Sequence, residues 1–225
     1  MTSTDKDGSD APVLSLSLNG LTLGGSQILG PMDLTVRRGE TLALVGPSGI
    51  GKSSLLRIFA GLETGYDGHC TVNGRSAIVF QEPALLPWRT ALQNICVTTR
   101  VSEDAATEAL AEVGLQDRAQ AFPGHLSLGQ QRRLTLARAF AVKPDLLLLD
   151  EPFVSLDPSL VDQMMGLFQR LRSAHGVTTV LVTHVRAEAE ALATRIVTLG
   201  GSPAVITSET ALPPAQGYTP KAPQP

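Results

Sequence analysis

Residues 42–60 read Leu-Ala-Leu-Val-Gly-Pro-Ser-Gly-Ile-Gly-Lys-Ser-Ser-Leu-Leu-Arg-Ile-Phe-Ala. Residues 42–45 predict a buried strand, and residues 55–60 predict a helix that follows a glycine-rich loop. The loop has the spacing of a phosphate-binding P-loop and comprises Gly46, Pro47, Ser48, Gly49, Ile50, Gly51, Lys52, Ser53 and Ser54. The glycines let backbone N–H groups close around phosphates, Lys52 can reach the terminal phosphates, and the Ser53 hydroxyl can bind Mg²⁺. The stretch therefore predicts binding of a nucleoside triphosphate.

The composition predicts one compact globular unit. The chain has 225 residues, of which 43% are hydrophobic, enough for the core of a single α/β domain. No stretch approaches the roughly 20 apolar residues of a membrane span, and residues 1–10 are too polar for a secretion signal. The net charge is -3 and the basic residues are scattered, so no nucleic-acid partner is expected. Cys70 and Cys96 lack the spacing of a zinc site or disulfide framework, and His69 is expected on the surface.

Strand and helix patterns alternate along the chain. Residues 13–18 have period two, with Leu14, Leu16 and Leu18 on one face. Further strands are predicted at residues 42–45, 77–80, 146–149, 179–182, 195–199 and 204–207. The clearest helix has Asp157 as its N-cap and ends at Gly176. Apolar strands alternating with such helices predict an α/β fold whose sheet is covered on both faces.

A pair of carboxylates follows one of these strands. Residues 146–149 are four leucines, and Asp150 and Glu151 come directly after them. They are expected at the C-terminal end of the strand, where α/β sheets bind ligands. Asp150 is placed to hold Mg²⁺ through water, and Glu151 can polarise a water for attack on the γ-phosphate. Alone such a string often marks only a strand end, but an upstream P-loop makes it strong evidence of a catalytic site.

Together with the P-loop, four more motifs make the sequence resemble the ATP-binding subunits of ABC transporters. Residues 126–130, Leu-Ser-Leu-Gly-Gln, resemble the signature peptide of that family, and residues 131–139 its expected helix. Gln81 resembles the Q-loop glutamine, residues 155–157 resemble the D-loop, and His184 resembles the switch histidine. The motifs occur in the family's order and with its short spacings over most of the chain.

The resemblance implies a P-loop NTPase core with a mainly parallel sheet, flanking helices and an antiparallel β part, plus a small helical subdomain. The ATPase domain would span residues 13–207, with the helical subdomain at about residues 82–130. Residues 1–12 and 208–225 would be flexible tails, because they are rich in small, charged and proline residues.

The resemblance also implies an ATPase that works as a head-to-tail dimer with Mg²⁺. Each ATP would lie between one subunit's P-loop and its neighbour's signature peptide, either in a homodimer or with a paralogous ATPase subunit. Glu151, His184 and Gln81 would be catalytic, and Ser53, Gln81 and Asp150 would serve the metal. Besides the P-loop, the nucleotide contacts would come from Ser127, Gly129, Gln130 and Asp157. Taken singly, His184 would more often be a core imidazole, a preference that the other motifs reverse, and Ser127 can be an ordinary N-cap and a nucleotide contact at once.

Three positions depart from the family pattern. Leu128 stands where the signature usually has glycine, and Val185 stands where an acidic residue usually follows the switch histidine. The family generally stacks adenine on an aromatic residue upstream of the P-loop, whereas residues 21–25 offer only Leu23. Tight recognition of adenine is therefore not expected, although the matching catalytic residues still predict an active ATPase.

Residues 81–90, Gln-Glu-Pro-Ala-Leu-Leu-Pro-Trp-Arg-Thr, resemble importer subunits of the nitrate, sulfonate and taurine group. Pro87 and Trp88 would shape the groove for a membrane partner, or Trp88 would fill the core of the subdomain. The predicted partners are membrane permease subunits and a solute-binding protein, at the cytoplasmic face of the cell membrane. A regulatory nucleotide-binding module with weak hydrolysis and an exporter subunit are the alternatives. A DNA-repair ATPase is disfavoured because its long coiled-coil arms have no counterpart here.

Overall fold

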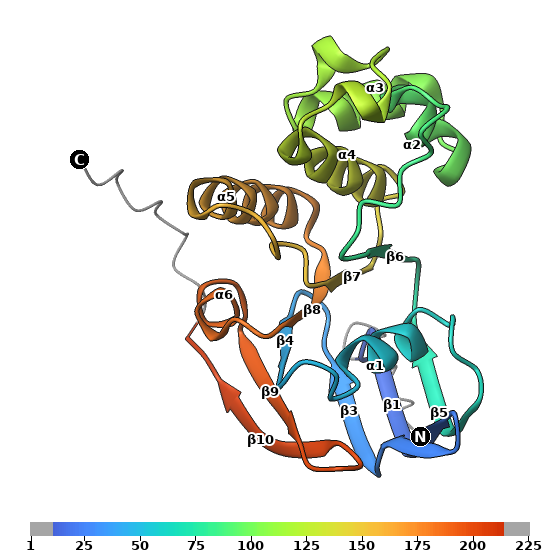
Figure 1. Ribbon diagram of the computed structural model, residues 1–225, viewed down its shortest axis with the longest axis vertical. Coiled ribbons are helices and arrows are strands. Elements are labelled where there is room, and N and C mark those ends of the chain that lie inside the picture. Colours follow the sequence, from blue (N-terminus) through green and yellow to red (C-terminus); the bar gives the residue numbers. More distant parts are fainter. Residues whose placement is uncertain (1–10, 214–225) are drawn as a thin grey trace, which may run out of the picture.

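The main body is a six-stranded sheet (Figure 1). The structure is a computed structural model that describes residues 11–213. The strand order is β10-β9-β4-β8-β7-β6, and every neighbouring pair is parallel except β10 with β9. The strands are β4 (Thr41–Val45), β6 (Ser76–Val79), β7 (Leu146–Asp150), β8 (Thr178–Thr183), β9 (Arg195–Gly200) and β10 (Val205–Ala211). The predicted α/β fold with a mainly parallel sheet is confirmed.

A smaller antiparallel sheet packs beside this body. Its long strand β1 (Leu14–Leu23) pairs with β2 (Ser26–Leu29), β3 (Met32–Val36) and β5 (Tyr66–Val72). The sequence analysis predicted only the first of these four strands, including the buried face of Leu14, Leu16 and Leu18. His69 is exposed in β5 as expected and its ring nitrogen lies 2.9 Å from the Thr71 hydroxyl.

Helices cover both faces of the large sheet, and three of them form a separate lobe (Figure 1). Helices α1 (Lys52–Phe59), α5 (Pro158–His175) and α6 (Arg186–Leu192) belong to the body. The lobe contains α2 (Ala91–Thr99), α3 (Glu103–Glu112), α4 (Leu128–Ala141) and the short 3-10 turns η2 (Gln116–Arg118) and η3 (Pro123–His125). None of the helices within residues 11–213 is long and apolar enough to cross a membrane.

The core is divided by the large sheet into two main clusters, as strand β7 shows. Leu147 and Leu149 pack with α4 and α5, whereas Leu146 and Leu148 pack with α1 and the antiparallel sheet. All four leucines are fully buried because β7 is covered on both faces. The C-terminal end of β7 is thereby held against α1, which brings Asp150 close to the P-loop.

The ends of the predicted domains differ in part from the structure. Strand β10 pairs with β9 as far as Ala211, so the ordered sheet continues four residues past the predicted end at residue 207 (211 − 207 = 4). The lobe begins within the predicted helical range of 82–130, but α4 carries it on to Ala141. Most of the two predicted tails, at residues 1–10 and 214–225, lies outside the described residues.

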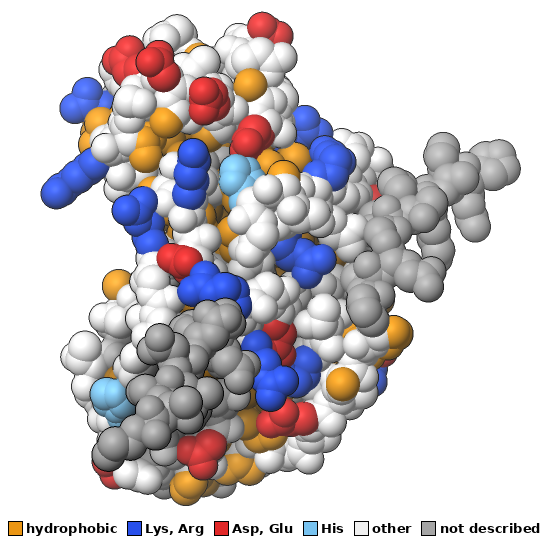
Figure 2. Space-filling view, turned by 180° about the vertical axis from the view of Figure 1, so that it is seen from behind, with side chains coloured by type: hydrophobic (Ala, Val, Ile, Leu, Met, Phe, Trp, Pro, Cys, Tyr) orange, Lys and Arg blue, Asp and Glu red, His pale blue; other side chains and the backbone are white. Residues whose placement is uncertain are grey.

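On the face shown in Figure 2, basic and acidic side chains are intermingled over both the lobe and the body. Direct ion pairs among the described residues include Arg38 with Asp145 at 2.8 Å and Arg195 with Glu40 at 2.6 Å. The visible charge is therefore locally balanced rather than collected in one stripe.

Candidate nucleotide-binding and catalytic site

The P-loop joins β4 to α1 and leaves the first turn of that helix open. Gly51 caps α1 in a left-handed conformation (φ 107°), and no side chain caps the helix N-terminus. A Cβ on Gly51 would lie 2.7 Å from the Leu29 side chain, and one on Gly46 would lie 2.8 Å from the Leu199 carbonyl oxygen. Both positions therefore require glycine. The uncapped N–H groups and the helix dipole together favour an anion at this point.

Lys52 lies over the loop with its side chain only 4% exposed. Its Nζ donates to the carbonyl oxygens of Gly46 and Pro47, both at 2.9 Å, and is 4.0 Å from Glu151 Oε1. Burial lowers the pKa of Lys52, and the carboxylates of Glu151 and Asp150 oppose that shift. The amine is thus held in a fixed position beside the space that the loop encloses.

Ser53 and Asp150, two of the residues predicted to serve the metal, are in direct contact. The Ser53 hydroxyl donates to Asp150 Oδ1 at 2.9 Å, which links the start of α1 to the end of β7. Burial raises the pKa of Asp150, while the hydrogen bond from Ser53 opposes the shift. No group of three or more His, Cys, Asp or Glu residues suited to a metal occurs within residues 11–213. One hydroxyl and one carboxylate fit Mg²⁺, which usually takes few protein ligands and completes its shell with water and substrate phosphates.

Glu151 and His184 form a second pair at the ends of β7 and β8. Glu151 Oε2 is 3.1 Å from His184 Nδ1, and the Glu151 backbone N–H donates to the Val182 carbonyl at 2.9 Å. Glu151 has a positive φ of 45°, an uncommon conformation for a residue with a side chain. The predicted pair of carboxylate and switch histidine is thus in direct contact.

Gln81 lines a cavity of about 510 Å³ together with Lys52, Ser53 and Glu151. Gln81 follows the end of β6, the edge strand beside β7. The cavity is lined by Leu23, Ile28, Ser48, Gly49, Gly51, Lys52, Ser53, Ser54, Gln81 and Glu151. Its size lies in the range of small-molecule sites. The structure therefore brings P-loop residues, the predicted base Glu151 and Gln81 around one space, and Asp150 is joined to that space through its hydrogen bond with Ser53.

The wall of this cavity at the end of β1 is aliphatic. Leu23 and Ile28 line it, and none of the lining residues is aromatic. Leu23 is 40% exposed, so its side chain has a free face toward the cavity. Ile28 was not singled out in the sequence, although it lies only three residues after Gly25 of the glycine turn at 24–25.

The signature and D-loop residues lie around a different cavity of about 490 Å³. Ser127 caps α4, its hydroxyl accepting from the Gln130 N–H at 3.3 Å while the Gln130 side chain accepts from the Ser127 N–H at 2.9 Å. Asp157 caps α5 by accepting from the Leu160 N–H at 3.1 Å, as predicted. Ser127, Gly129, Gln130 and Asp157 thus share one cavity, but they do not line the P-loop cavity of the same chain. The capping role of the Ser127 hydroxyl is compatible with the predicted contact to a neighbour's nucleotide, since one hydroxyl can make both hydrogen bonds.

The structure shows the surroundings of Leu128 and Val185, two of the three positions that depart from the family pattern. Leu128 is exposed at the start of α4 and lines the signature cavity. Next to Val185, the Thr183 hydroxyl accepts from the Val185 N–H at 3.0 Å and donates to Glu188 Oε2 at 2.6 Å. Burial raises the pKa of Glu188, and the Thr183 hydrogen bond opposes the shift. Glu188 therefore supplies a polar anchor for the switch turn that sequence analysis missed, and its place four residues after His184 was the available signal.

Trp88 projects from the loop between Gln81 and α2 and is 68% exposed. The interpretation that it fills the core of the helical subdomain is therefore wrong. The loop that carries Trp88 is anchored instead by Asn94, whose side chain is fully buried. It accepts from the Leu86 N–H at 2.7 Å and donates to the carbonyl oxygens of Leu86, Arg89 and Thr90 at 3.0–3.1 Å. An indole presented in this way is available to a partner surface.

Comparisons with known proteins agree with this geometry. Residues 29–154 match a family model described as ABC transporter. An aliphatic sulfonates import ATP-binding protein of Granulibacter bethesdensis is 46% identical over 190 residues, which cover 84% of this chain and 80% of the relative. One of the same description from Nocardia farcinica is 42% identical over 213 residues, or 92% of this chain and 87% of the relative. An ATP-binding cassette solved as a dimer in a post-hydrolysis state with ADP and Pi superposes with a TM-score of 0.77 at 27% identity, covering 89% of this chain and 99% of that one.

Proposed function

The chain belongs to the ABC transporter family, and on that premise we propose that it powers an importer of aliphatic sulfonates. It is an ATP-hydrolysing subunit, since its relatives are import ATP-binding proteins and its structural neighbour is an ATPase cassette with ADP and Pi. The import assignment disfavours the exporter alternative. The sulfonate is proposed because the two relatives described above carry that substrate in their descriptions.

One observation carries the hydrolytic role: Lys52, Ser53, Gln81 and Glu151 line a single cavity, with Asp150 and His184 in contact with two of them. A purely regulatory nucleotide site would need the P-loop but not a carboxylate held by a histidine at the cavity. The pairing of Glu151 with His184 therefore favours turnover over regulation alone.

In the proposed mechanism the P-loop N–H groups and Lys52 bind the phosphates of ATP. Mg²⁺, held by the Ser53 hydroxyl and the Asp150 carboxylate, would neutralise phosphate charge. Glu151 accepts a proton from the attacking water, or orients it, and His184 keeps the carboxylate in position through its 3.1 Å contact. Gln81 lines the same cavity as Glu151, and its amide can hold the water or the metal.

The second cavity is proposed to serve the nucleotide of a neighbouring subunit. In one chain Ser127 and Gly129 line a space that contains no P-loop residue, so their predicted phosphate contacts require another copy. The dimeric state of the structural neighbour agrees with this arrangement. ATP would stabilise the dimer because it binds the closed form better than the open form. The dimer would associate with permease subunits, and with a solute-binding protein, at the cytoplasmic face of the membrane.

The test is ATP-driven uptake in vesicles that contain the chain and its membrane subunits. An alkanesulfonate should be taken up in the presence of the solute-binding protein, and Glu151→Gln should abolish uptake without dissociating the complex. Taurine and nitrate serve as competing solutes. Uptake of nitrate with no uptake of any sulfonate would refute the proposed substrate, and sulfonate uptake unaffected by Glu151→Gln would refute the proposed base.

A further inference from the structure

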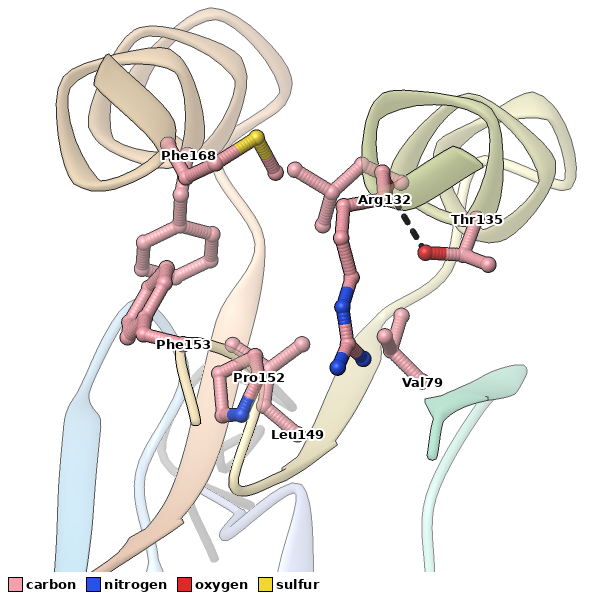
Figure 3. A pocket seen from close by; sticks show the side chains of 9 residues that line it. Val79, Arg132, Thr135, Leu149, Pro152, Phe153 and Phe168 are labelled. Carbon is pink, nitrogen blue, oxygen red and sulfur yellow. Dashed lines mark hydrogen bonds between the residues drawn. The ribbon is translucent and has the colours of Figure 1, made fainter. Parts of the chain in front are cut away.

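Arg132 extends from α4 into the junction between the helical lobe and the body of the protein (Figure 3). It lies one turn after the signature residues, and its side chain points between Val79 on one side and Pro152 and Phe153 on the other. Arg132 is only 5% exposed, and Nη1 donates a hydrogen bond to the Gln81 backbone carbonyl. The guanidinium therefore links the signature helix to the residue proposed to contact water or metal.

The surroundings of Arg132 do not favour a charged group. The small cavity beside it has a volume of about 10 Å³, room for one water at most. It is lined largely by apolar side chains, namely Val79, Leu136, Leu149, Pro152, Phe153, Met164 and Phe168. Within residues 11–213 Arg132 Nε has no hydrogen-bond partner. Burial lowers the pKa of Arg132, and Glu82 opposes that shift only in part.

Stability alone does not account for an arginine at this position. Replacing a buried charged group by an apolar one of similar volume is often neutral or stabilising. The cavity is too small for an anionic ligand that could repay the burial of the charge. What the arginine provides, and an apolar residue would not, is the hydrogen bond to the Gln81 carbonyl.

We propose that Arg132 is a positioning residue that sets the place of Gln81 according to the place of α4. A second arginine strengthens the attachment, because Arg138 donates to the Pro83 and Ala84 carbonyl oxygens at 3.1 and 2.9 Å. Residues 81–84 are thus attached to α4 at two points, and α4 begins directly after Ser127. A change in the position of α4 would therefore be passed to the backbone of residues 81–84 through these hydrogen bonds. The inference rests on the proposed role of Gln81.

The test compares Arg132→Met with Arg132→Lys in the full chain. Met fills the apolar surroundings but cannot donate, whereas Lys keeps one donor. Arg132→Met should leave the Tm unchanged or raised and the KM for ATP within about twofold, while kcat falls roughly 10- to 100-fold, as expected for a misplaced group. Arg132→Lys should recover much of the lost kcat. Arg118→Met is the matched control, since Arg118 is an exposed arginine of the same lobe.

Several results would overturn the inference. These are a kcat of Arg132→Met within twofold of wild type, equal kcat losses in the Met and Lys variants, or a kcat loss matched by a lower Tm and weaker ATP binding. Gln81→Ala separates this inference from the proposed function. If Gln81→Ala keeps the wild-type kcat, the role given to Gln81 is wrong and the inference falls with it. If Gln81→Ala is slow and Arg132→Met is not, only the role of Arg132 is refuted.

Discussion

Replacing Glu151 by Gln tests the carboxylate that lies between Lys52 and His184. Oε2 of Glu151 is 3.1 Å from His184 Nδ1, and Oε1 is 4.0 Å from Lys52 Nζ. Gln has the same shape and keeps an oxygen for His184, but it cannot accept a proton from water. We expect kcat to fall by roughly 10²–10⁴-fold. This range corresponds to about 2.7–5.4 kcal/mol in the activation barrier.

ATP binding should survive the same substitution. The P-loop glycines, Lys52 and Ser53 are untouched, and one negative charge is removed from beside Lys52. Two unit charges 4 Å apart interact by about 1 kcal/mol in water and about 4 kcal/mol at an effective dielectric of 20. Because Glu151 keeps some exposure, the gain in attraction for phosphate should be toward the lower end of that range. The Kd for ATP should therefore be unchanged or several-fold lower, and ATP should trap a dimer.

Phosphate release at saturating ATP measures the first effect, and equilibrium ATP binding with size-exclusion chromatography measures the second. Glu190→Gln makes the same chemical change at an exposed position of α6, where the Glu190 carboxylate pairs with Arg186 at 2.7 Å. It should change stability by less than about 0.5 kcal/mol and leave kcat alone. A kcat for Glu151→Gln within threefold of wild type would show that Glu151 is not the base. In a His184→Ala background the further loss should be much smaller, since the two groups act as a unit.

Three further outcomes follow from the two cavities and the loop between them. Ser127→Arg should leave ATP binding at the P-loop intact but abolish turnover of the homodimer, and mixing with Lys52→Ala subunits should restore at most one working site; full activity of the Ser127→Arg homodimer would rule out a head-to-tail dimer. GTP should compete with ATP within roughly tenfold because the wall at Leu23 lacks a stacking ring, normally worth about 1–3 kcal/mol, and Leu23→Tyr should tighten ATP binding. A strong wild-type preference for ATP, unaffected by Leu23→Tyr, would show that adenine is bound by residues other than Leu23. Asn94→Ala should lower the free energy of unfolding by about 2–4 kcal/mol because it leaves buried partners unsatisfied, whereas Asn73→Ala, with one exposed hydrogen bond, should cost under about 1 kcal/mol; similar urea midpoints for the two would contradict the role of Asn94.

The elements that sequence analysis predicted are those whose pattern of apolar and capping residues is complete within a short stretch of sequence. The four leucines of β7 and the Asp-Pro start of α5 are complete local signals, and the structure has both where they were predicted. Strand β5 shows the opposite case, because Asp67, Gly68 and His69 all have low strand propensity. Strand β5 exists because all of it, from Tyr66 to Val72, pairs with β1. The backbone of β1 approaches so closely at Ser17 and Leu18 that only a glycine fits at residue 68. Pairing between distant segments, not local preference, decides that strand.

The site shows the same division. Lys52, Ser53, Asp150 and Glu151 could be brought together from sequence, since the C-terminal ends of parallel strands in one sheet lie along the same edge. Strand β3 alternates buried and exposed residues from Met32 to Val36, so its period-two signal was present but short. The contact of Arg132 with Gln81 had no local signal, because it depends on how far a side chain from the lobe reaches across a loop of the body.

A single short segment, residues 151–157, contributes to both cavities. Glu151 lines the P-loop cavity, and Ser155 and Asp157 line the signature cavity. The middle of the segment is fixed, because Phe153 is buried in the core cluster beside α4 and α5. Glu151 and Ser155 on either side of it both have positive φ, at 45° and 61°. Backbone strain of this kind persists only where packing over-determines it, and here Phe153 supplies that packing. Contacts that a neighbour makes at Asp157 therefore act on the same packed segment that holds Glu151 at the P-loop cavity.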